Sequence, residues 1–555
     1  MLEVLARSQR GRICEFRCND VTVRTPAVLR SVPDNMMHIS VSGTKRELVI
    51  GGRRITMDRG LRTVLSSNIN REPVNDRGVC ILRLPLSGDE MIPDDTDIAV
   101  ISNAFELKKD ARKLVDSVIQ ARRIIGPNVL LYLPGIADAS DLALLAYMGV
   151  DLFDDTFSIA AGRSGILCIP EGNIISDGDV SDRNIGETVN ECAKVSTFIN
   201  AGRLRELVDQ RVSSPTLVAA LRIFDRVGYE YQEEACGTVG SRFSCNTTQS
   251  LQRPEVERFR RMMKERYTPP EHKRILVLLP CSAKKPYHTS KTHKAFSSAI
   301  HTGDHDTLVH EVIVTSPLGI VPRELDVFFP ASSYDIPVTG EWKCQEREMI
   351  RDALSKLLEF EYDSVISHLG STTELIRGLT DLTETCVGDP ASPVSLRNLE
   401  NAVIDAAAGM ERCGYHPDRQ NSMRSVLRFQ FGREAADALM EDADVTGKFP
   451  YWKIHSGKKQ MGMLTPERGM ISLTTDGAER LLSVNANVAE MGDFELKGNL
   501  FAIGVLKADH SLRVGDETVV IANGEVKAVG VAEMPGEEME RLNRGIAVKI
   551  RHKVK

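Results

Sequence analysis

The first 228 residues alternate short apolar runs with longer amphipathic stretches, a pattern typical of strands that alternate with helices. Strands are predicted at 97–101, 129–133 and 150–153, and helices at 107–125 and 142–148. This rhythm favours a parallel β/α barrel or a layered parallel sheet. Polar residues suited to catalysis follow the predicted strands, namely Asn103, Asp138, Asp154 and Asp155. Each aspartate equally suits a helix N-cap or a solvated loop.

The segment 229–389 has a different pattern, with apolar runs that predict buried strands at 275–279, 309–315 and 364–368. A proline after Arg253 predicts the start of a basic amphipathic helix. We expect a doubly wound α/β domain here, in which the carboxyl ends of the three strands converge on one crevice.

The segment PCSAKKPY, residues 280–287, places the thiol of Cys281 directly after the first of these strands. The side chains that follow are hydroxyls, imidazoles and ammonium groups, among them Ser282, Lys284, Lys285, Tyr287, Ser290 and His293. Because lysines beside a cysteine lower the pKa of its thiol, we expect a reactive Cys281. A basic surface loop around a structural cysteine fits the same residues.

A loop rich in proline and glycine, residues 328–342, carries Tyr334 next to Asp335. An aromatic ring beside a carboxylate is suited to stack on a purine-like base and to accept a hydrogen bond from its amino group. A packed surface loop is an equally good interpretation of this segment.

The last part of the chain reads as a small connecting domain, 390–468, followed by a β domain, 469–555, in which strands alternate with glycine turns. This β domain resembles a PUA domain, an RNA-binding pseudo-barrel. Its last fifteen residues hold no acid, and they offer a phosphate-binding patch made of Arg541, Arg544, Lys549 and Arg551. A generic basic tail is the alternative.

Composition narrows these possibilities. A chain of 555 residues should split into about three or four domains. Neither a membrane span nor a signal peptide is visible in the sequence, so we expect a cytoplasmic protein. The 11 cysteines form no CxC or CxxC pair, which argues against a compact zinc site or a radical cluster but leaves dispersed metal ligands open. With a net charge of −7, nucleic-acid binding has to come from local patches.

The first region resembles tRNA-guanine transglycosylases through GVDLFDDT (149–156), GRIC (11–14) and GRSGIL (162–167). In that family the matching aspartate, here Asp154, attacks the ribose. The family's DSGGFQ-like segment and its CxCxxC zinc ligands are missing, with Cys192 as their one remnant. The region is also shorter than the roughly 250 residues of a complete barrel. The resemblance therefore implies a β/α-barrel-like domain, 1–228, that binds tRNA without base exchange and without zinc, and no cofactor is expected in this chain.

The motifs PCSAKKPYHTSKTH, SPLGIVPREL and YDIPVTGEW together resemble the archaeosine synthase family over nearly the whole chain. The resemblance implies a transferase that acts on tRNA bearing 7-cyano-7-deazaguanine in the D-arm and converts its nitrile toward a formamidine. Free lysine adds to the nitrile, and a separate radical SAM partner protein then cleaves the adduct; glutamine as the nitrogen donor stays open. A homodimer also stays open.

Within this interpretation the catalytic candidates are Cys281, Lys284 and Asp335. The candidate substrate-binding residues are Ser282, Lys285, Tyr287, Ser290, His293, Tyr334 and Asp154. Cys281 either forms a thioimidate with the nitrile or only shapes the pocket while the amine attacks directly. Two other functions remain as alternatives: a transglycosylase that exchanges guanine for 7-cyano-7-deazaguanine, and a non-catalytic tRNA-binding scaffold.

Overall fold

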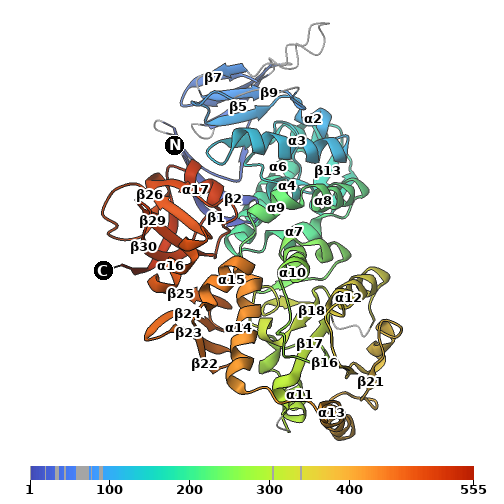
Figure 1. The fold of residues 1–555 in the computed structure, drawn as a ribbon. Coiled ribbons are helices and arrows are strands. Elements are labelled where there is room, and N and C mark those ends of the chain that lie inside the picture. Colours follow the sequence, from blue (N-terminus) through green and yellow to red (C-terminus); the bar gives the residue numbers. More distant parts are fainter. Residues whose placement is uncertain are drawn as a thin grey trace.

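The computed structural model describes residues 2–18, 21–31, 37–42, 45–57, 74–76, 78–86, 92–302, 305–337 and 341–554. Figure 1 shows the amino-terminal part at the top, the central α/β domain at the bottom and the carboxyl-terminal β domain to the left, in contact with both. The expected mixed α/β class, with a parallel-sheet domain and a carboxyl-terminal β pseudo-barrel, is confirmed.

The amino-terminal part is built on a six-stranded sheet of order β4-β12-β11-β10-β9-β8, in which all neighbours except β8 and β9 run parallel. Its strands are β4 (Ala27–Leu29), β8 (Val74–Asp76), β9 (Val79–Leu82), β10 (Ile98–Ile101), β11 (Leu130–Tyr132) and β12 (Leu152–Asp154). In the described ranges β4 and β8 are edge strands, so the sheet is barrel-like without a closing pair. Two antiparallel sheets flank it, β1 (Leu2–Ser8) with β2 (Gly11–Cys18) and β3 (Val21–Arg24), and β5 (Met37–Ser42) with β6 (Lys45–Ile50) and β7 (Arg53–Thr56).

Helices cover one face of this sheet, and the two helices expected from the sequence are confirmed. The first helix, α3 (Ala111–Ile125), begins later than predicted because the Asp110 side chain accepts hydrogen bonds from the backbone N–H groups of Arg112 and Lys113. The residues before it form the separate turn α2 (Ala104–Leu107). The remaining helices of this part are α4 (Leu142–Tyr147), α5 (Thr156–Arg163), α6 (Ser181–Asn200), α7 (Leu204–Arg211), α8 (Pro215–Val227) and α9 (Tyr229–Glu234), and a hairpin joins β13 (Ile166–Ile169) to β14 (Gly172–Ile175).

The central domain follows α10 (Pro254–Glu265), which starts at the proline as predicted. Its sheet has the order β18-β17-β16-β20-β21, with β18 antiparallel to β17 and the other pairs parallel. The strands are β16 (Ile275–Pro280), β17 (Val309–Thr315), β18 (Gly319–Pro322), β20 (Ser364–Ser367) and β21 (Thr383–Glu384), and the helices are α11 (Lys291–Ile300), α12 (Cys344–Leu357) and α13 (Pro393–Ala407). The three predicted strands are confirmed.

The continuous apolar run of β16 reflects a sheet that is covered on both faces. Leu276 and Leu278 pack into the large core on the α10 and α12 side. Val277 and Leu279 point to the opposite face, where they pack against Phe296 of α11 and the α13 helix. Because successive side chains of a strand point to opposite faces, every position in such a strand must be apolar.

The connecting part places α14 (Tyr415–Phe431) and α15 (Arg433–Met440) before the antiparallel sheet β22 (Asp444–Lys448), β23 (Tyr451–Ser456), β24 (Lys459–Thr465) and β25 (Met470–Leu473). The helix α16 (Thr475–Ser483) follows. The predicted boundary at residue 469 falls in the turn between the paired strands β24 and β25.

The last β domain has the strand order β27-β31-β30-β29-β26-β28. Its elements are β26 (Val488–Met491), β27 (Leu500–Phe501), β28 (Val505–Ala508), β29 (Glu517–Ala522), β30 (Glu525–Ala532), α17 (Gly536–Arg541) and β31 (Ile546–Lys553). Val519, Ile521, Val526 and Val529 of this domain belong to the same apolar core as the central sheet. None of the helices in the described ranges is long and apolar enough to cross a membrane.

Candidate functional site

Three parallel strands of the central sheet end at one edge and open onto a cavity of about 1040 Å³. Cys281 follows β16, Ser316 follows β17, and Ser371 and Thr372 lie in the helical turn after β20. The expected crevice at the carboxyl ends of the three strands is therefore present. Its lining comprises Cys245, Asn246, Thr247, Thr248, Gln249, Leu251, Cys281, Ser316, Ile336, Pro337, Glu341, Trp342, Lys343, Glu346, Arg347, Ser371, Thr372 and Leu375.

Cys281 lines the cavity and is exposed as a whole residue, whereas its sulfur lies among protein atoms that desolvate it. Burial of the thiol raises its pKa above the ordinary value, against the opposing effects of a hydrogen bond with Thr315 and of the positive charge on Lys285. The sequence-based expectation of a lowered thiol pKa is therefore wrong. Of the two lysines in the motif only Lys285 acts on the sulfur, and its charge does not outweigh the desolvation of the thiol. At neutral pH the site holds mainly the protonated thiol.

Three hydroxyl groups form a buried cluster next to this thiol. The Tyr334 hydroxyl lies 2.5 Å from the Thr315 hydroxyl and is hydrogen-bonded to the Tyr287 hydroxyl, which donates to Thr315 at 3.3 Å. Both tyrosines are buried, and burial raises their pKa values. The sequence suggested that the Tyr334 ring stacks on a base. Because the ring is buried, it is not open for such stacking. Trp342 is the aromatic side chain that lines the cavity.

The two lysines of the motif differ in environment. Lys285 is partly buried, with its ammonium group 4.1 Å from the centroid of the Tyr334 ring and 3.4 Å from the Ser282 carbonyl oxygen. Desolvation lowers its pKa, so its ammonium group is a stronger proton donor than an ordinary lysine. Lys284 is exposed. The structure therefore favours Lys285 over Lys284 for a proton transfer near Cys281.

Asp335 lies close to Lys285 but already has a cationic partner. Its carboxylate accepts a hydrogen bond from Arg242 at 2.7 Å, and both side chains are well exposed. An exposed pair of this kind exchanges partners at little cost. Asp335 does not belong to the described lining of the cavity of Cys281, and an incoming ammonium group would have to displace its contact with Arg242.

Three of the predicted substrate-binding residues have structural roles. Ser290 caps α11 by accepting from the backbone N–H of His293. His293 is fully buried and accepts a hydrogen bond from Arg323 on Nδ1, and desolvation lowers its pKa to about 3. The Ser282 hydroxyl donates to the Lys284 carbonyl oxygen within its own loop. None of the three lines the cavity in the described structure.

Sequence reasoning missed Thr315 and Glu346. Thr315 ends β17, and only the three-dimensional pairing of strands brings it beside Cys281. Glu346 accepts from the Ser316 hydroxyl at 2.5 Å and from the Lys343 backbone N–H at 2.9 Å, which fixes the first turn of α12 against the end of β17. An acidic residue at the third position of a helix is the sequence signal that could have identified it.

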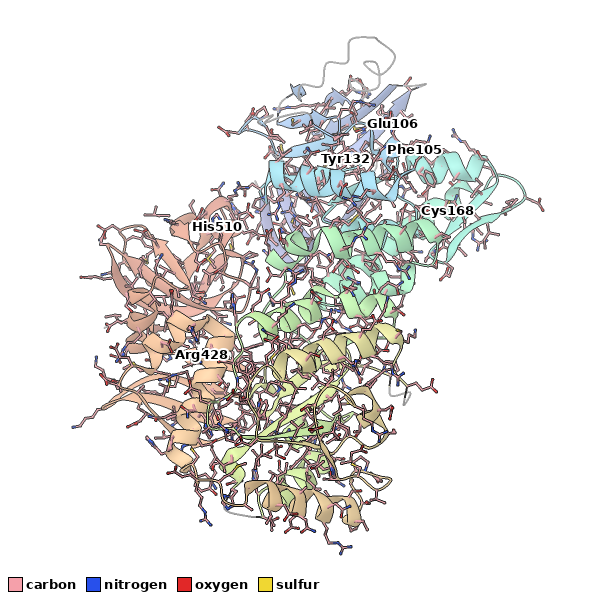
Figure 2. All side chains as sticks on the ribbon, turned by 45° about the vertical axis from the view of Figure 1, so that its right-hand side comes forward. Phe105, Glu106, Tyr132, Cys168, Arg428 and His510 are labelled. Carbon is pink, nitrogen blue, oxygen red and sulfur yellow. The ribbon has the colours of Figure 1, made fainter. Side chains whose placement is uncertain are left out.

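Asp154 lies in the amino-terminal domain, away from the central sheet. Its carboxylate accepts from the Tyr132 hydroxyl at 2.6 Å and from the backbone N–H groups of Gly135 and Thr156, both at 2.9 Å. Figure 2 shows Tyr132 in the upper domain, well above the central sheet. The other strand-end residues are similarly occupied: Asn103 bonds the backbone of Leu84, and Asp138 contacts Lys108.

The four basic residues predicted to bind RNA are spread over two environments. Lys549 is exposed, while Arg541 and Arg544 are partly exposed and pair weakly with Glu537 at 3.0 Å and Glu3 at 3.7 Å. Arg551 instead is hydrogen-bonded to the buried carboxylate of Glu517. We assign Arg551 a structural role at the boundary between the β domain and β25.

Three family models match separate parts of the chain. A domain of unknown function, DUF5591, matches residues 256–403; the patch-forming domain C2 of tRNA-guanine transglycosylase matches 421–486; the PUA domain matches 489–554. The chain is 34% identical to an archaeosine synthase subunit alpha of Methanosarcina acetivorans, covering 82% of this chain and 80% of that one. It is 30% identical to an archaeosine synthase of Haloferax volcanii, covering 99% and 98%. A tRNA-guanine(15) transglycosylase of Methanobrevibacter smithii is 25% identical over 84% of this chain and 73% of that one.

Proposed function

Because this chain belongs to the archaeosine synthase family, we propose that it adds free lysine to the nitrile of 7-cyano-7-deazaguanine in the D-arm of tRNA. Family membership makes it a tRNA-modifying enzyme of archaeosine biosynthesis. The observation that carries the finer proposal is the cavity beside Cys281, which is large enough for a modified base and an amino acid together.

The chemistry requires one nucleophile and one proton transfer. The neutral amine of lysine forms a bond to the nitrile carbon, one π bond of the nitrile breaks, and its electron pair moves to nitrogen. That nitrogen takes a proton while the attacking amine loses one, so the product is an amidine and no proton is consumed overall. Lys285 is the best-placed proton donor, since desolvation lowers the pKa of its ammonium group.

The direct attack of lysine is favoured over a thioimidate intermediate. Only a thiolate adds to a nitrile, and burial raises the pKa of the Cys281 thiol. In the direct route Cys281 forms part of the wall against which the nitrile lies, and the buried Thr315 supports it from behind. Trp342 supplies an aromatic face to the same cavity.

The cavity wall also suits a zwitterionic amino acid. Glu341 lies just before α12, and Lys343, Glu346 and Arg347 lie at its start, so carboxylates and cations alternate along this part of the wall. Opposite charges at this spacing complement a molecule that carries both an ammonium and a carboxylate group. This arrangement supports lysine, with its additional ammonium group, as the nitrogen donor.

The PUA domain and the exposed Lys549 support tRNA as the macromolecular substrate. Cleavage of the lysine adduct belongs to a second polypeptide, a radical SAM protein, in this scheme. A transglycosylase activity is disfavoured because the Asp154 carboxylate is already held by three hydrogen bonds in a buried site.

Incubation of the purified full-length chain with labelled lysine and nitrile-bearing tRNA tests the proposal. Covalent transfer of the label to tRNA is expected, with labelled glutamine giving none. Exchange of labelled guanine without lysine transfer would support the transglycosylase instead. Binding of tRNA with neither reaction would reduce the chain to a scaffold.

A further inference from the structure

A small pocket of about 50 Å³ lies between the amino-terminal part and the PUA domain. The β1–β2 hairpin and the end of α3 line it from the amino-terminal part, and α17 lines it from the PUA domain. It shares no lining residue with the cavity of Cys281. We call it the arginine pocket, because five of its lining side chains are those of Arg7, Arg10, Arg12, Arg122 and Arg123.

The most buried of these charges form a triad with a single carboxylate. Asp151 pairs with Arg12 at 2.9 Å and also with Arg122. The side chains of Arg12 and Arg122 are 10% and 7% exposed, and that of Asp151 is 1% exposed. One positive charge is therefore buried without a counter-charge, which is costly unless an anion lies nearby.

A second pair of arginines also shares one carboxylate. Glu234 pairs with Arg10 at 2.5 Å and with Arg123 at 2.6 Å. Both guanidinium groups lie over the ring of Tyr231, at 3.9 and 5.7 Å from its centroid. A second positive charge at the pocket thus lacks a counter-charge.

The two carboxylates that line the pocket do not neutralise this excess. Glu538 is paired with Arg7 at 2.6 Å, and Glu537 is paired with Arg541 at 3.0 Å. The described ion pairs of the pocket therefore leave two positive charges in excess.

Two N–H groups of the pocket remain free to donate. Arg10 donates from Nε to the Tyr231 carbonyl oxygen and from Nη2 to Glu234, which leaves Nη1. Arg7 donates from Nη1 and Nη2 to Glu538, which leaves Nε. Neither group is among the buried atoms that lack a partner in the described part of the chain, so solvent reaches both.

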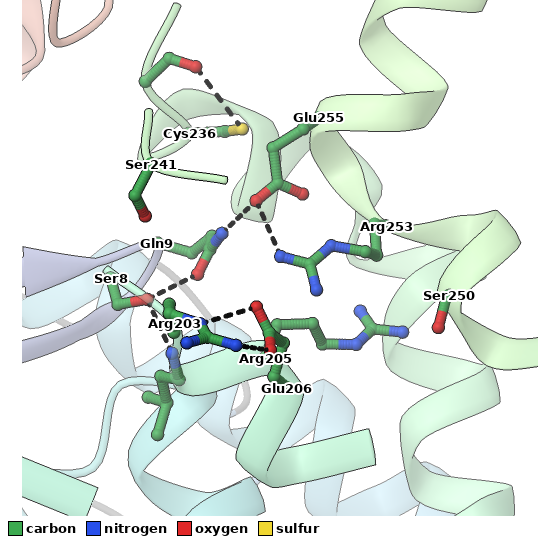
Figure 3. A network of polar contacts seen from close by, with 12 residues as sticks. Ser8, Gln9, Arg203, Arg205, Glu206, Cys236, Ser241, Ser250, Arg253 and Glu255 are labelled. Atoms are coloured by element: carbon green, nitrogen blue, oxygen red, sulfur yellow. Dashed lines mark hydrogen bonds and ion pairs between the residues drawn. The ribbon is translucent and has the colours of Figure 1, made fainter. Parts of the chain in front are cut away.

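The turn that carries Arg10 is held from its other side. Gln9 donates to the carboxylate of Glu255 and accepts from the Ser8 hydroxyl at 3.0 Å (Figure 3). The Ser8 hydroxyl in turn accepts from the backbone N–H of Leu204 at 3.1 Å. Because the turn is already fixed, Arg10 loses little conformational freedom when it binds a further group.

We propose that the arginine pocket binds a phosphate group. Its oxygens accept hydrogen bonds from Arg10 Nη1 and Arg7 Nε, and its negative charge compensates for the excess positive charge of the pocket. One water molecule needs about 10–15 Å³, so the pocket has room for about three to five atoms of that size. That room fits a phosphate group and is too small for a nucleobase or an amino acid.

Two sources supply such a group, the backbone of tRNA and free inorganic phosphate. The position of the pocket favours tRNA, because α17 belongs to the PUA domain. The partly exposed side chains of Arg123 and Arg541 also continue the positive charge to the surface. This inference holds whichever reaction the cavity of Cys281 performs.

Calorimetric titration of the full-length chain with inorganic phosphate tests the site, at constant ionic strength and with acetate as a probe that carries one negative charge. Phosphate should bind in the millimolar range or tighter, and acetate at least tenfold more weakly. Arg10→Met removes a free donor and one excess charge, and it should weaken phosphate binding at least fivefold. Arg112→Met, on the same helix as Arg123 but in an exposed pair with Asp116, is the control and should bind phosphate like the wild type.

Arg123→Met removes the same excess charge from an exposed position and serves if Arg10→Met does not fold; it should weaken phosphate binding at least threefold. Three results would each overturn the proposal: acetate binds the wild type as tightly as phosphate, the folded variants bind phosphate like the wild type, or Arg112→Met weakens binding as much as they do.

A tRNA transcript identifies the source of the phosphate. If tRNA supplies it, Arg10→Met and Arg123→Met should bind the transcript at least threefold more weakly than Arg112→Met, and inorganic phosphate should compete with the transcript on the wild type. Weakened phosphate binding with unchanged affinity for the transcript would support a site for free phosphate. Neither measurement requires transfer of lysine, so a failure of the proposed reaction does not affect the result.

Discussion

At the residue scale, the environment of Cys281 decides how the nitrile is attacked. The thiol lies against Thr315 in a site that raises its pKa. We expect Cys281→Ser to keep lysine transfer within about tenfold of the wild-type rate, a change in barrier of about 1.4 kcal/mol, because a direct attack needs no thiolate. Single-turnover transfer of labelled lysine to tRNA measures this. A larger loss, together with a protein–tRNA adduct in the wild type under denaturing conditions, would instead establish the thioimidate.

The paired lysines of the motif offer a matched comparison. Lys285 lies over the Tyr334 ring close to the thiol, whereas Lys284 points to solvent. Because general acid catalysis contributes about 10²–10⁴-fold, Lys285→Met should slow lysine transfer at least a hundredfold at saturating substrates. Lys284→Met should change it less than threefold. Equal losses in the two variants would show that the motif acts through its overall charge.

The buried imidazole of His293 leads us to predict a loss of folding stability at acid pH. Its pKa is about 3 in the folded chain, because desolvation and the Arg323 guanidinium disfavour the protonated ring, against about 6.5 when unfolded. Above pH 6.5 the ring is neutral in both states and adds no pH dependence. Below it the unfolded state binds a proton that the folded state does not, so stability falls by about 1.4 kcal/mol per pH unit down to about pH 3.

The variant His293→Gln lacks this titration and should lose stability more gradually between pH 6 and 4 than the wild type. Urea unfolding at several pH values measures both slopes. Parallel slopes for the two proteins would mean that His293 is protonated in the folded chain.

At the element scale, sequence periodicity predicted three strands of each parallel sheet, β10, β11 and β12 in the first and β16, β17 and β20 in the second, and Pro254 predicted the start of α10. Buried parallel strands such as β16 can be recognised in the sequence as continuous apolar runs, because both faces of the strand must be apolar. The predicted start of the helix at Leu107 falls on the last residue of α2, and the hydrogen bonds of the Asp110 cap that separate α2 from α3 are local. The residues around Cys281 were harder to find. Thr315 lies beside it only through strand order, and Glu346 lines the same cavity only through the placement of α12, which a single sequence does not encode locally.

The contact between β31 and β25 should contribute measurably to the stability of the chain. Arg551 of β31 binds the carboxylate of Glu517, which also accepts from the backbone N–H of Leu473 at 2.9 Å and from Arg468 at 3.2 Å. Arg551→Met leaves this buried carboxylate short of one donor and should destabilise the chain by about 1–3 kcal/mol. Arg544→Met, at a partly exposed pair, should cost less than about 1 kcal/mol. Chemical denaturation measures the unfolding free energy of both variants. Equal losses in the two would contradict a structural role for Arg551.

At the scale of the whole molecule, the PUA domain is joined to its neighbours more closely than a terminal β domain suggests. Arg7 of β1 donates to Glu538 at 2.9 and 2.6 Å, and Arg513 reaches Glu233 at 2.7 Å. Val519 and Val529 pack into the core of the central part. The domain therefore supports the arrangement of the other parts, in addition to the tRNA-binding role that we propose for it.

This packing changes what a truncation should do. Cutting at residue 469 would remove β25 from its sheet, so the informative deletion starts at residue 487, after α16. We expect that deletion to lower the thermal stability of the remaining domains, because it uncovers apolar surface of the shared core at a cost of about 25 cal/mol per Å². Thermal unfolding followed by far-ultraviolet circular dichroism measures this. An unchanged unfolding temperature after the deletion would show that the PUA domain is an independent unit.

The point variant Lys549→Glu should instead weaken tRNA binding, most at low salt, without changing the unfolding temperature, since it alters an exposed charge only.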